Sequence, residues 1–550
     1  MKIVIIGAVA AGTSAAAKAR RNDEKAEIKI YEMDRDISYS GCGLPYYIGG
    51  RIPDRGQIVP RNAAYFKKKY NVDIFTRHKV LEIFPAEKKL TVMDLESGEE
   101  FTDTYDKLVI ATGAKTVLPG IDGSDKPNVF TLRNVENADG IKSHIAGRAP
   151  RRAVIIGSGY IGMEMLENLH ESGIKTTVIE AGDHVMASLD RDIAVYLESM
   201  LEKKGVEVIL KDSAVRFEGE PYVERVVLGS GRIIETDLVI VSVGVRPEVS
   251  LAAKAGVHIG PTGAISINRS MQTNFPDIYA AGDCAESFSL ITGKPLYRPL
   301  GSTANKTGRI AGDSMTGGDL EFRGILGTSI FKIFETTVAQ TGLSEAEARA
   351  EGYDVETAHL IKPDRPEYFG GRDMVIKAVA EKACGRLLGA QIIGEAGVDK
   401  RIDVFATAIS FGARVGDLFH LDLAYAPPYA TSKDPAAYTG MVLENAINRG
   451  RKLITADELE SRLDGDEKIT VLDARPPKQF EASHIEGALN IPQENMREEL
   501  CGLDKDGTFV TYCNRGVTGN AAQNILLNNG FREVYNLSGG HKNYAKRRGR

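Results

Sequence analysis

The sequence predicts an α/β protein in which two Rossmann-like domains precede an α+β domain and a small C-terminal α/β domain. Three observations support this prediction. Two segments repeat the order strand, glycine-rich turn, helix and strand, several later apolar runs end in glycine, and a polar segment separates a new strand and helix pattern near the C-terminus. The length of 550 residues allows three or four domains, at roughly 100–200 residues per domain.

The first Rossmann-like segment begins at the N-terminus. An apolar run over residues 3–6 predicts a strand, Gly7 and Gly12 bound the turn, and Glu32 ends the following strand. In dinucleotide-binding proteins such glycines let the backbone approach a pyrophosphate, and an acidic residue roughly 20 positions later contacts a ribose hydroxyl. Val9 occupies the usual position of the middle glycine, so this segment departs from the common motif.

The second segment carries the full motif. After an apolar run over residues 153–156 come Gly157, Gly159 and Gly162, and Glu180 ends the next predicted strand. A carboxylate there accepts a hydrogen bond from a ribose 2′-hydroxyl and repels a 2′-phosphate. We therefore expect this domain to prefer NADH to NADPH. The alternative is that Glu180 is an ordinary surface carboxylate.

Two later segments belong with the first sheet. One apolar run leads to Thr112 and Gly113, and another leads to Gly282 and Asp283, whose carboxylate could bind a ribityl or ribose hydroxyl. A first domain formed by residues 1–118 and 246–322, split around a second domain at 119–245, explains this order. Residues 323–445 have a mixed α+β pattern, residues 446–452 form a polar linker, and residues 453–550 form the last domain.

Composition limits the function classes. The net charge of −6 gives no general attraction to nucleic acid or anionic lipid. The five cysteines are widely spaced and include no Cys-x-x-Cys pair, so we expect neither a disulfide framework nor a metal site. The N-terminal strand leads at once into the glycine turn, unlike a signal peptide, and no apolar run reaches the ~20 residues of a membrane helix. We expect a cytoplasmic protein with no nucleic-acid or membrane partner.

Cys42 is the most informative single residue. It follows the first nucleotide-binding unit and has no second cysteine beside it, so its thiol must exchange with a sulfur atom from outside the protein. Pro45 is suited to the first turn of a helix, and a helix N-terminus lowers the pKa of a thiol. We therefore expect a stabilised thiolate at Cys42. The alternative is an inert buried thiol.

With these motifs in place, residues 1 to about 445 resemble the coenzyme A disulfide reductase branch of the pyridine nucleotide-disulfide oxidoreductases. Residues from about 453 onward resemble a rhodanese domain. The motifs that carry the resemblance are residues 38–50, 399–404 and 425–435. The resemblance implies an FAD-binding domain, an NAD(P)-binding domain, a dimerisation domain and a rhodanese domain, in the order given above.

The resemblance also implies roles for individual residues. Cys42 matches the redox-active cysteine, and Tyr425 matches a tyrosine that reaches the partner's active site in a homodimer. Tyr368 matches a second such tyrosine more loosely. Residues at positions that contact coenzyme A are Ser14, Arg21, Ser38, Asn305 and Lys433. Two departures concern the substrate: Gly41 replaces the usual asparagine, and the segment around Tyr368 lacks the family's histidine.

The last domain contains a second candidate nucleophile. Cys513 follows a predicted strand and precedes a helix, in a loop whose backbone N–H groups would cradle an anion. The related phosphatase loop has an arginine six residues after its cysteine, whereas this chain has Gly519. We therefore expect Cys513 to carry a persulfide, as in rhodaneses.

The implied activity is the FAD-dependent reduction of coenzyme A disulfide, coenzyme A persulfide or polysulfide by NAD(P)H, coupled to sulfur transfer. Two alternatives remain. An NADH peroxidase or oxidase also uses one cysteine but usually has a histidine in the first glycine turn, where this chain has Ala10 and Ala11. A non-catalytic FAD-bound sulfur carrier or redox sensor would not need the second nucleotide motif.

Overall fold

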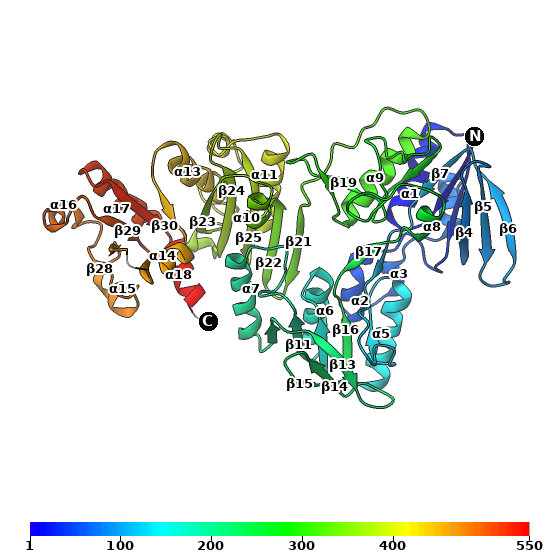
Figure 1. The fold of residues 1–550 in the computed structure, drawn as a ribbon, viewed down its shortest axis with the longest axis horizontal. Helices are drawn as coiled ribbons and strands as arrows, with labels where there is room; N and C mark the ends of the chain where they lie inside the picture. The colour runs from blue at the N-terminus through cyan, green and yellow to red at the C-terminus, as the bar shows by residue number, and fades with distance from the viewer. Residues whose placement is uncertain (466, 549–550) are drawn as a thin grey trace. The chain divides into compact units, whose positions relative to one another are not determined.

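The computed structural model describes residues 1–465 and 467–548. The chain divides into two compact units, one formed by residues 1–185 and 205–327 and the other by residues 186–204 and from 328 onward (Figure 1). Each unit contains more than one sheet. Across the described residues, no helix has both the length and the apolar character needed to cross a membrane.

The first sheet of the first unit is parallel, with the strand order β18-β7-β1-β2-β3. Its strands are β1 (Lys2–Ile6), β2 (Glu27–Glu32), β3 (Asp73–Thr76), β7 (Lys107–Ile110) and β18 (Ile278–Ala280). The apolar residues of β1, β2, β7 and β18 are buried, whereas those of β3 at the edge of the sheet are partly buried. Helix α1 (Ala10–Asn22) packs against α9 (Gly301–Ser314). The strands predicted before Thr112 and Gly282 therefore join the sheet of the first glycine turn.

The second sheet of this unit is also parallel, with the order β12-β11-β10-β16-β9. Its strands are β9 (Val129–Phe130), β10 (Arg152–Ile156), β11 (Lys175–Glu180), β12 (Glu207–Leu210) and β16 (Leu238–Val241). Helix α6 (Tyr160–Glu171) packs on β10 and β11, and α5 (Val135–Arg148) packs on α2 (Leu44–Ile48). The two nucleotide-binding sheets predicted from the glycine motifs are thus confirmed.

Smaller elements complete the first unit. Two three-stranded antiparallel sheets comprise β4 (His78–Phe84), β5 (Lys89–Asp94) and β6 (Glu100–Thr104), and β13 (Ala214–Glu218), β14 (Arg225–Leu228) and β15 (Ile233–Glu235). The remaining strands pair as β8 (Ala114–Thr116) with β17 (Val245–Pro247), and β19 (Ser287–Phe288) with β20 (Pro295–Leu296). The remaining helices are η1 (Gly41–Gly43), α3 (Arg55–Ile58), α4 (Ala63–Tyr70) and α8 (Ser250–Lys254).

The second unit is built on an antiparallel sheet with the order β21-β22-β25-β24-β23. Its strands are β21 (Ser329–Ile333), β22 (Thr336–Gly342), β23 (Val355–Pro363), β24 (Asp373–Glu381) and β25 (Leu387–Gly394). Helices in this part of the chain are α10 (Glu345–Ala350), η2 (Glu367–Phe369), α11 (Val398–Ser410), α12 (Asp417–His420) and α13 (Pro435–Asn448). Helix α7 (Arg191–Lys203), which lies between β11 and β12 in the sequence, packs against β25 of this sheet.

The C-terminal domain has a parallel sheet with the order β26-β30-β29-β27-β28. Its strands are β26 (Leu453–Ile454), β27 (Ile469–Asp473), β28 (Leu489–Asn490), β29 (Thr508–Tyr512) and β30 (Glu533–Leu537). Its helices are α14 (Ala456–Leu463), α15 (Pro477–Ala482), α16 (Met496–Glu499), η3 (Leu500–Gly502), α17 (Val517–Asn528) and α18 (Gly540–Arg548). Because α13 runs to Asn448, the first residues of the predicted linker are helical.

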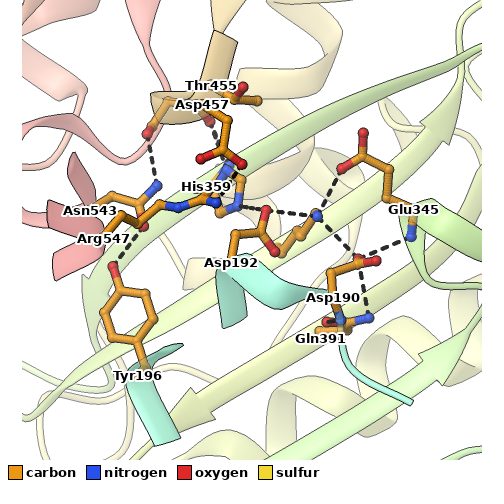
Figure 2. Close-up of polar contacts among 12 residues, drawn as sticks. Asp190, Asp192, Tyr196, Glu345, His359, Gln391, Thr455, Asp457, Asn543 and Arg547 are labelled. Atoms are coloured by element: carbon orange, nitrogen blue, oxygen red, sulfur yellow. Dashed lines mark hydrogen bonds and ion pairs between the residues drawn. The ribbon is translucent and has the colours of Figure 1, made fainter. Parts of the chain in front are cut away.

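A buried charged cluster lies between α7 and the antiparallel sheet (Figure 2). The ammonium group of Lys377 on β24 lies 2.7 Å from Asp192, 2.8 Å from Glu345 and 3.1 Å from Asp190. Burial alone would lower the pKa of Lys377, but these three carboxylates raise it above its ordinary value. The cluster therefore keeps its charges and fixes α7 on the sheet.

The same cluster extends to the C-terminal domain. The Nε2 atom of His359 on β23 lies 2.8 Å from Asp192, and the backbone N–H of His359 donates to Ser538 Oγ at 2.7 Å. The hydroxyl of Tyr196 on α7 donates to Asn543 Oδ1 on α18 at 2.8 Å (Figure 2). These contacts hold the C-terminal domain against the sheet and α7.

We predict that Lys377→Met destabilises the second unit, because it leaves buried carboxylates without their cation. Breaking a buried ion pair from one side costs about 3–5 kcal/mol. For a unit of this size this corresponds to a transition temperature lower by roughly 6–15 °C. Since the chain has no tryptophan, scanning calorimetry is the suitable measurement. Lys382→Met is the control, because Lys382 is half-exposed and its ion pairs are long. An equal effect of both substitutions would contradict the prediction.

Candidate active site

The first glycine turn is shaped by close backbone approaches. Gly7 has a φ of +105°, which favours glycine, and a Cβ on Gly12 would collide with the carbonyl oxygen of Gly7. The buried carboxylate of Glu32 accepts hydrogen bonds from the backbone N–H groups of Ala8 at 2.6 Å and Asp34 at 2.9 Å. Burial raises the pKa of Glu32, although these bonds oppose the shift. The turn and the acid meet at one end of the sheet, an arrangement that fits a bound dinucleotide.

The second glycine turn repeats this geometry. Gly157 has a φ of +95°, and a Cβ on Gly162 would collide with the carbonyl oxygen of Gly157. A Cβ on Gly159 would meet no atom within 4 Å, so this residue borders open space at the N-terminus of α6. Glu180 accepts hydrogen bonds from the backbone N–H groups of Ser158 at 3.0 Å and Gly182 at 2.8 Å. A helix N-terminus with open space suits a pyrophosphate.

The predicted residues at the ends of β7 and β18 lie beside the first turn. A Cβ on Gly282 would crowd Ala11, and the Gly282 N–H donates to Thr307 Oγ1 at 3.0 Å. Thr112 Oγ1 donates to the carbonyl oxygen of Glu248 at 2.6 Å, and Gly113 has a φ of +70°. Burial raises the pKa of Asp283, although Arg133 lies 3.8 Å away. The partly desolvated carboxylate of Asp283, beside the first glycine turn, is a suitable hydrogen-bond acceptor for a ligand hydroxyl.

Cys42 lies in the short helix η1, directly before α2. The residue is exposed at the surface of the first unit. Partial burial of the thiol raises its pKa, and the carboxylates of Glu164 and Asp283 raise it further. The expectation of a stabilised thiolate is therefore wrong for the chain alone. Helix α2 has only five residues, whereas burial of the thiol and then two carboxylates from distant segments raise the pKa of Cys42.

Glu164 is a site residue that the motif analysis missed. It lies on α6, two residues after Gly162, and burial followed by the charge of Glu167 raises its pKa to about 7. Its negative charge acts on Cys42. The sequence feature that could have identified Glu164 is an acidic residue in the first turns of the helix that follows the glycine motif. The spacing alone could not show that this helix approaches Cys42.

A cavity of about 480 Å³ brings together the predicted coenzyme A contacts of the first unit. Ser14 and Arg21 from α1, Ser38 from the following loop and Asn305 from α9 all line it. Ser14 Oγ and Asn305 Oδ1 are 2.7 Å apart. Because residues 7 positions apart share one face of a helix, the spacing of Ser14 and Arg21 is consistent with a common ligand.

The cavity also contains side chains that the sequence analysis did not select. They are Val9, Ala10, Thr13, Ala17, Tyr39, Arg61, Phe66, Tyr70 and Arg309. Arg309 is four residues after Asn305 and so lies one helical turn away on α9. This spacing could have identified Arg309 from the sequence. Arg61 comes from a loop before α4, and no pattern in the sequence connects it with α1. The lining of the cavity thus includes three arginines and three aromatic residues.

Three predicted site residues lie in the second unit. Tyr425 and Lys433 are exposed in the segment before α13, and Tyr368 is exposed in η2. Other exposed aromatic residues of the same domain are Phe369, Phe411, Phe419 and Tyr429. Such a concentration of exposed rings is typical of a surface that another chain covers.

Cys513 lies in the loop between β29 and α17, as predicted. The residue is 6% exposed, and its carbonyl oxygen accepts the N–H of His541 at 2.7 Å. Gly516 opens α17 with a φ of +91°. The buried pair Asp473–Arg475 supports the loop, because Arg475 Nη1 donates to Asn514 Oδ1 at 3.2 Å. The loop therefore has the fixed form that an anion cradle requires.

Sequence models of known families match most of the chain. The model of the pyridine nucleotide-disulphide oxidoreductases matches residues 1–299. The model of the dimerisation domain of these proteins matches residues 328–437, and that of the rhodanese-like domain matches residues 455–547.

Individual proteins resemble the chain over most of its length. A Pyrococcus horikoshii protein named NAD(P)H coenzyme A polysulfide/persulfide reductase is 38% identical over 446 residues, which are 80% of this chain and 98% of that protein. The crystal structure of reduced Bacillus anthracis CoADR-RHD has a TM-score of 0.96 and 36% identity, and covers 99% of this chain and 98% of that one. A NAD-dependent persulfide reductase from A. fulgidus has a TM-score of 0.92 and 37% identity, and covers 99% of this chain and 100% of that one. This chain belongs to the pyridine nucleotide-disulphide oxidoreductase family and carries, in addition, a C-terminal rhodanese-like domain.

Proposed function

We propose that this protein reduces coenzyme A persulfide, coenzyme A disulfide or polysulfide with NAD(P)H, using FAD and the single thiol of Cys42. The observation that carries the proposal is the arginine-lined cavity beside the segment that leads to Cys42. Its lining includes Ser38, four residues before Cys42 in the chain. The names of the relatives described above, which include coenzyme A and persulfide, support the same substrate class.

The cavity suits the nucleotide end of coenzyme A. Arg21, Arg61 and Arg309 offer guanidinium groups to its phosphates, and arginine binds phosphate through paired hydrogen bonds. Tyr70 offers an aromatic face, and Ser14 and Asn305 offer neutral polar contacts. A ligand held in this way would extend its thiol end along Ser38 and Tyr39 toward Cys42.

The two glycine turns would hold the cofactors. Gly7, Gly12, Glu32, Thr112, Gly113, Gly282 and Asp283 would contact FAD, and Gly157, Gly159, Gly162 and Glu180 would contact NAD(P)H. When bound, FAD supplies two-electron transfer from NAD(P)H. The position of Glu180 at the second turn supports NADH as the preferred donor.

The role of Cys42 follows from thiol–disulfide exchange. Its thiolate attacks one sulfur of coenzyme A disulfide, the S–S bond breaks, and one coenzyme A thiolate leaves. The second coenzyme A stays on Cys42 as a mixed disulfide. With a persulfide, attack on the outer sulfur releases coenzyme A and leaves a Cys42 persulfide. Two electrons from NAD(P)H then regenerate the Cys42 thiolate and release coenzyme A or hydrosulfide.

The active form would be a homodimer. The match to the dimerisation domain and the exposed aromatic residues of that domain support an interface there. In this arrangement Tyr425 of one protomer would reach the active site of the other, with Tyr368 and Lys433 nearby. Tyr425 is 54% exposed and Tyr368 is 75% exposed, so both side chains are available to a partner.

The rhodanese-like domain would transfer sulfane sulfur at Cys513. Its thiolate attacks the outer sulfur of thiosulfate, the S–S bond breaks, and sulfite leaves with the bonding electrons. The resulting persulfide gives its outer sulfur to an accepting nucleophile, which restores the Cys513 thiolate. Covalent linkage of the two modules raises the concentration of one near the other.

The peroxidase or oxidase alternative is less consistent with the site. Ala10 lines the arginine-rich cavity and offers no proton donor to a peroxide. A non-catalytic sulfur carrier would not need the open space at Gly159 or the carboxylate of Glu180. The arrangement of both nucleotide turns therefore favours turnover.

We predict that Arg61→Met raises KM for coenzyme A disulfide by about tenfold, the lower end of the loss of one charge-assisted hydrogen bond. KM for pantethine, the phosphate-free disulfide with the same thiol end, should change less than about twofold. Steady-state NADH oxidation with the two disulfides makes the comparison. Lys67→Met on α4 is the control, because the Lys67 side chain pairs with Asp73 outside the cavity. An equal rise in KM for both disulfides would count against the coenzyme A site.

The pKa of Cys42 should fall in Glu164→Gln. Glu164 has a pKa of about 7, so above neutral pH its negative charge opposes ionisation of the thiol, and a neutral amide removes that charge. The pH dependence of alkylation by iodoacetamide, followed at the Cys42 peptide by mass spectrometry, measures the pKa. Glu136→Gln, on the exposed surface of α5, provides the comparison. An unchanged or higher pKa of Cys42 in Glu164→Gln would refute this coupling.

A further inference from the structure

The catalytic loop of the rhodanese-like domain is tied to the dimerisation domain by two ion pairs. Arg515, two residues after Cys513, places Nη2 2.7 Å from Asp373 Oδ2 at the start of β24. The ammonium group of Lys542 on α18 lies 2.9 Å from the same oxygen. The loop that carries Cys513 therefore lies against the dimerisation domain, which belongs to the same unit.

Two side chains of that surface stand beside the loop. Lys362 at the end of β23 places its ammonium group 4.2 Å from the ring centroid of Tyr438 on α13. Burial raises the pKa of Tyr438, and the charge of the Cys513 thiolate adds to the increase. Burial lowers the pKa of Lys362, and the charges of Arg515 and Lys433 lower it further. Both side chains are thus within the electrostatic field of the Cys513 loop.

The charges of this region do not balance. Arg515 and Lys542 share the carboxylate of Asp373, and the charges of Arg515 and Lys433 both act on Lys362. The nearest acids along the dimerisation domain have cations of their own: Asp364 pairs with Arg365, and Asp434 pairs with Arg401. An excess of positive charge around a recessed nucleophile favours the arrival of an anion.

The position of the loop relative to this surface is fixed by the buried cluster of Figure 2. The backbone N–H of His359 donates a hydrogen bond to Ser538. Two residues after Ser538, Gly540 lies so close to the carbonyl oxygen of Cys513 that a Cβ at this position would collide with it. Tyr196 holds Asn543 on the following helix. The segment 538–543 that supports the catalytic loop is therefore bonded directly to α7 and to the sheet.

We propose that the sulfurtransferase site is composite, with Lys362 and Tyr438 of the dimerisation domain forming its outer wall. Lys362 binds the anionic group of an incoming sulfane-sulfur donor, and the Tyr438 hydroxyl donates a hydrogen bond to it. The dimerisation domain, and not the rhodanese-like domain alone, sets the preference for anionic donors. The sulfur transfer itself rests on the role proposed above for Cys513.

A charge-selective probe tests this arrangement in the full holoenzyme. Iodoacetate is anionic and iodoacetamide is neutral, and both alkylate a thiolate, so the ratio of their rates at Cys513 reports anion attraction independently of thiol ionisation. We expect Lys362→Met to lower this ratio about fivefold, and to raise KM for thiosulfate in thiosulfate:cyanide transfer by a similar factor, since an ion pair open to water contributes up to about 1 kcal/mol. Tyr438→Phe should raise KM for thiosulfate less.

Lys332→Met and Tyr353→Phe, elsewhere in the same domain, are the controls and should leave the ratio unchanged. An unchanged ratio in Lys362→Met overturns the composite site, whatever happens to transfer. If wild-type protein lacks thiosulfate:cyanide transfer, or Cys513→Ala retains it, the proposed role of Cys513 fails. A lowered ratio in Lys362→Met would still support the anion site in that case, so the two failures are distinguishable.

Discussion

A thiol without a second thiol beside it must find its exchange partner in solution, and this constraint accounts for the arrangement around Cys42. The first unit provides two dinucleotide turns, and a cavity with three arginines lies next to the segment that leads to the thiol. The arginines would retain a phosphate-bearing carrier while its sulfur is exchanged. The protein thus replaces a resolving cysteine with a binding site for the resolving thiol, which would otherwise be lost to dilution at each turnover.

The two reactive cysteines lie in opposite electrostatic surroundings. Burial and then nearby carboxylates raise the pKa of Cys42, and Glu164 itself has a pKa of about 7. In the Cys513 loop, Arg515 shares the carboxylate of Asp373 with Lys542, and its charge acts on Lys362 of β23. Negative charge near Cys42 disfavours its thiolate, whereas positive charge in the Cys513 loop would favour the approach of an anionic donor. This difference suits a reductase whose thiol should react only with its own substrate, joined to a domain that would accept sulfane sulfur.

Local features could be predicted from the sequence, and features that depend on the meeting of distant segments could not. Gly7, Gly12, Gly157 and Gly162 could be assigned because the requirement for glycine is local. Gly7 and Gly157 have positive φ, and a Cβ on Gly12 or Gly162 would collide with a carbonyl oxygen five residues earlier. Ser14 and Asn305 were assigned through the family resemblance, and the cavity brings them together. Arg61 was missed because only folding brings its loop to α1. The pKa of Cys42 was predicted in the wrong direction, since the fold partly buries the thiol and brings Glu164 and Asp283 to it from other segments. Nothing in the pattern of α7 showed that its acids pair with Lys377 on β24.

The account depends on Cys42 taking its partner sulfur from the substrate, and the adduct on that cysteine tests this directly. Protein with Cys42 in the reduced thiol form, incubated with coenzyme A disulfide in the absence of NADH, should release one coenzyme A thiol per subunit. Peptide mapping by mass spectrometry should find the second coenzyme A on Cys42, and Cys42→Ser should form no adduct at this position. A disulfide between Cys42 and another cysteine of the chain, or full NADH-dependent turnover by Cys42→Ser, would contradict the account.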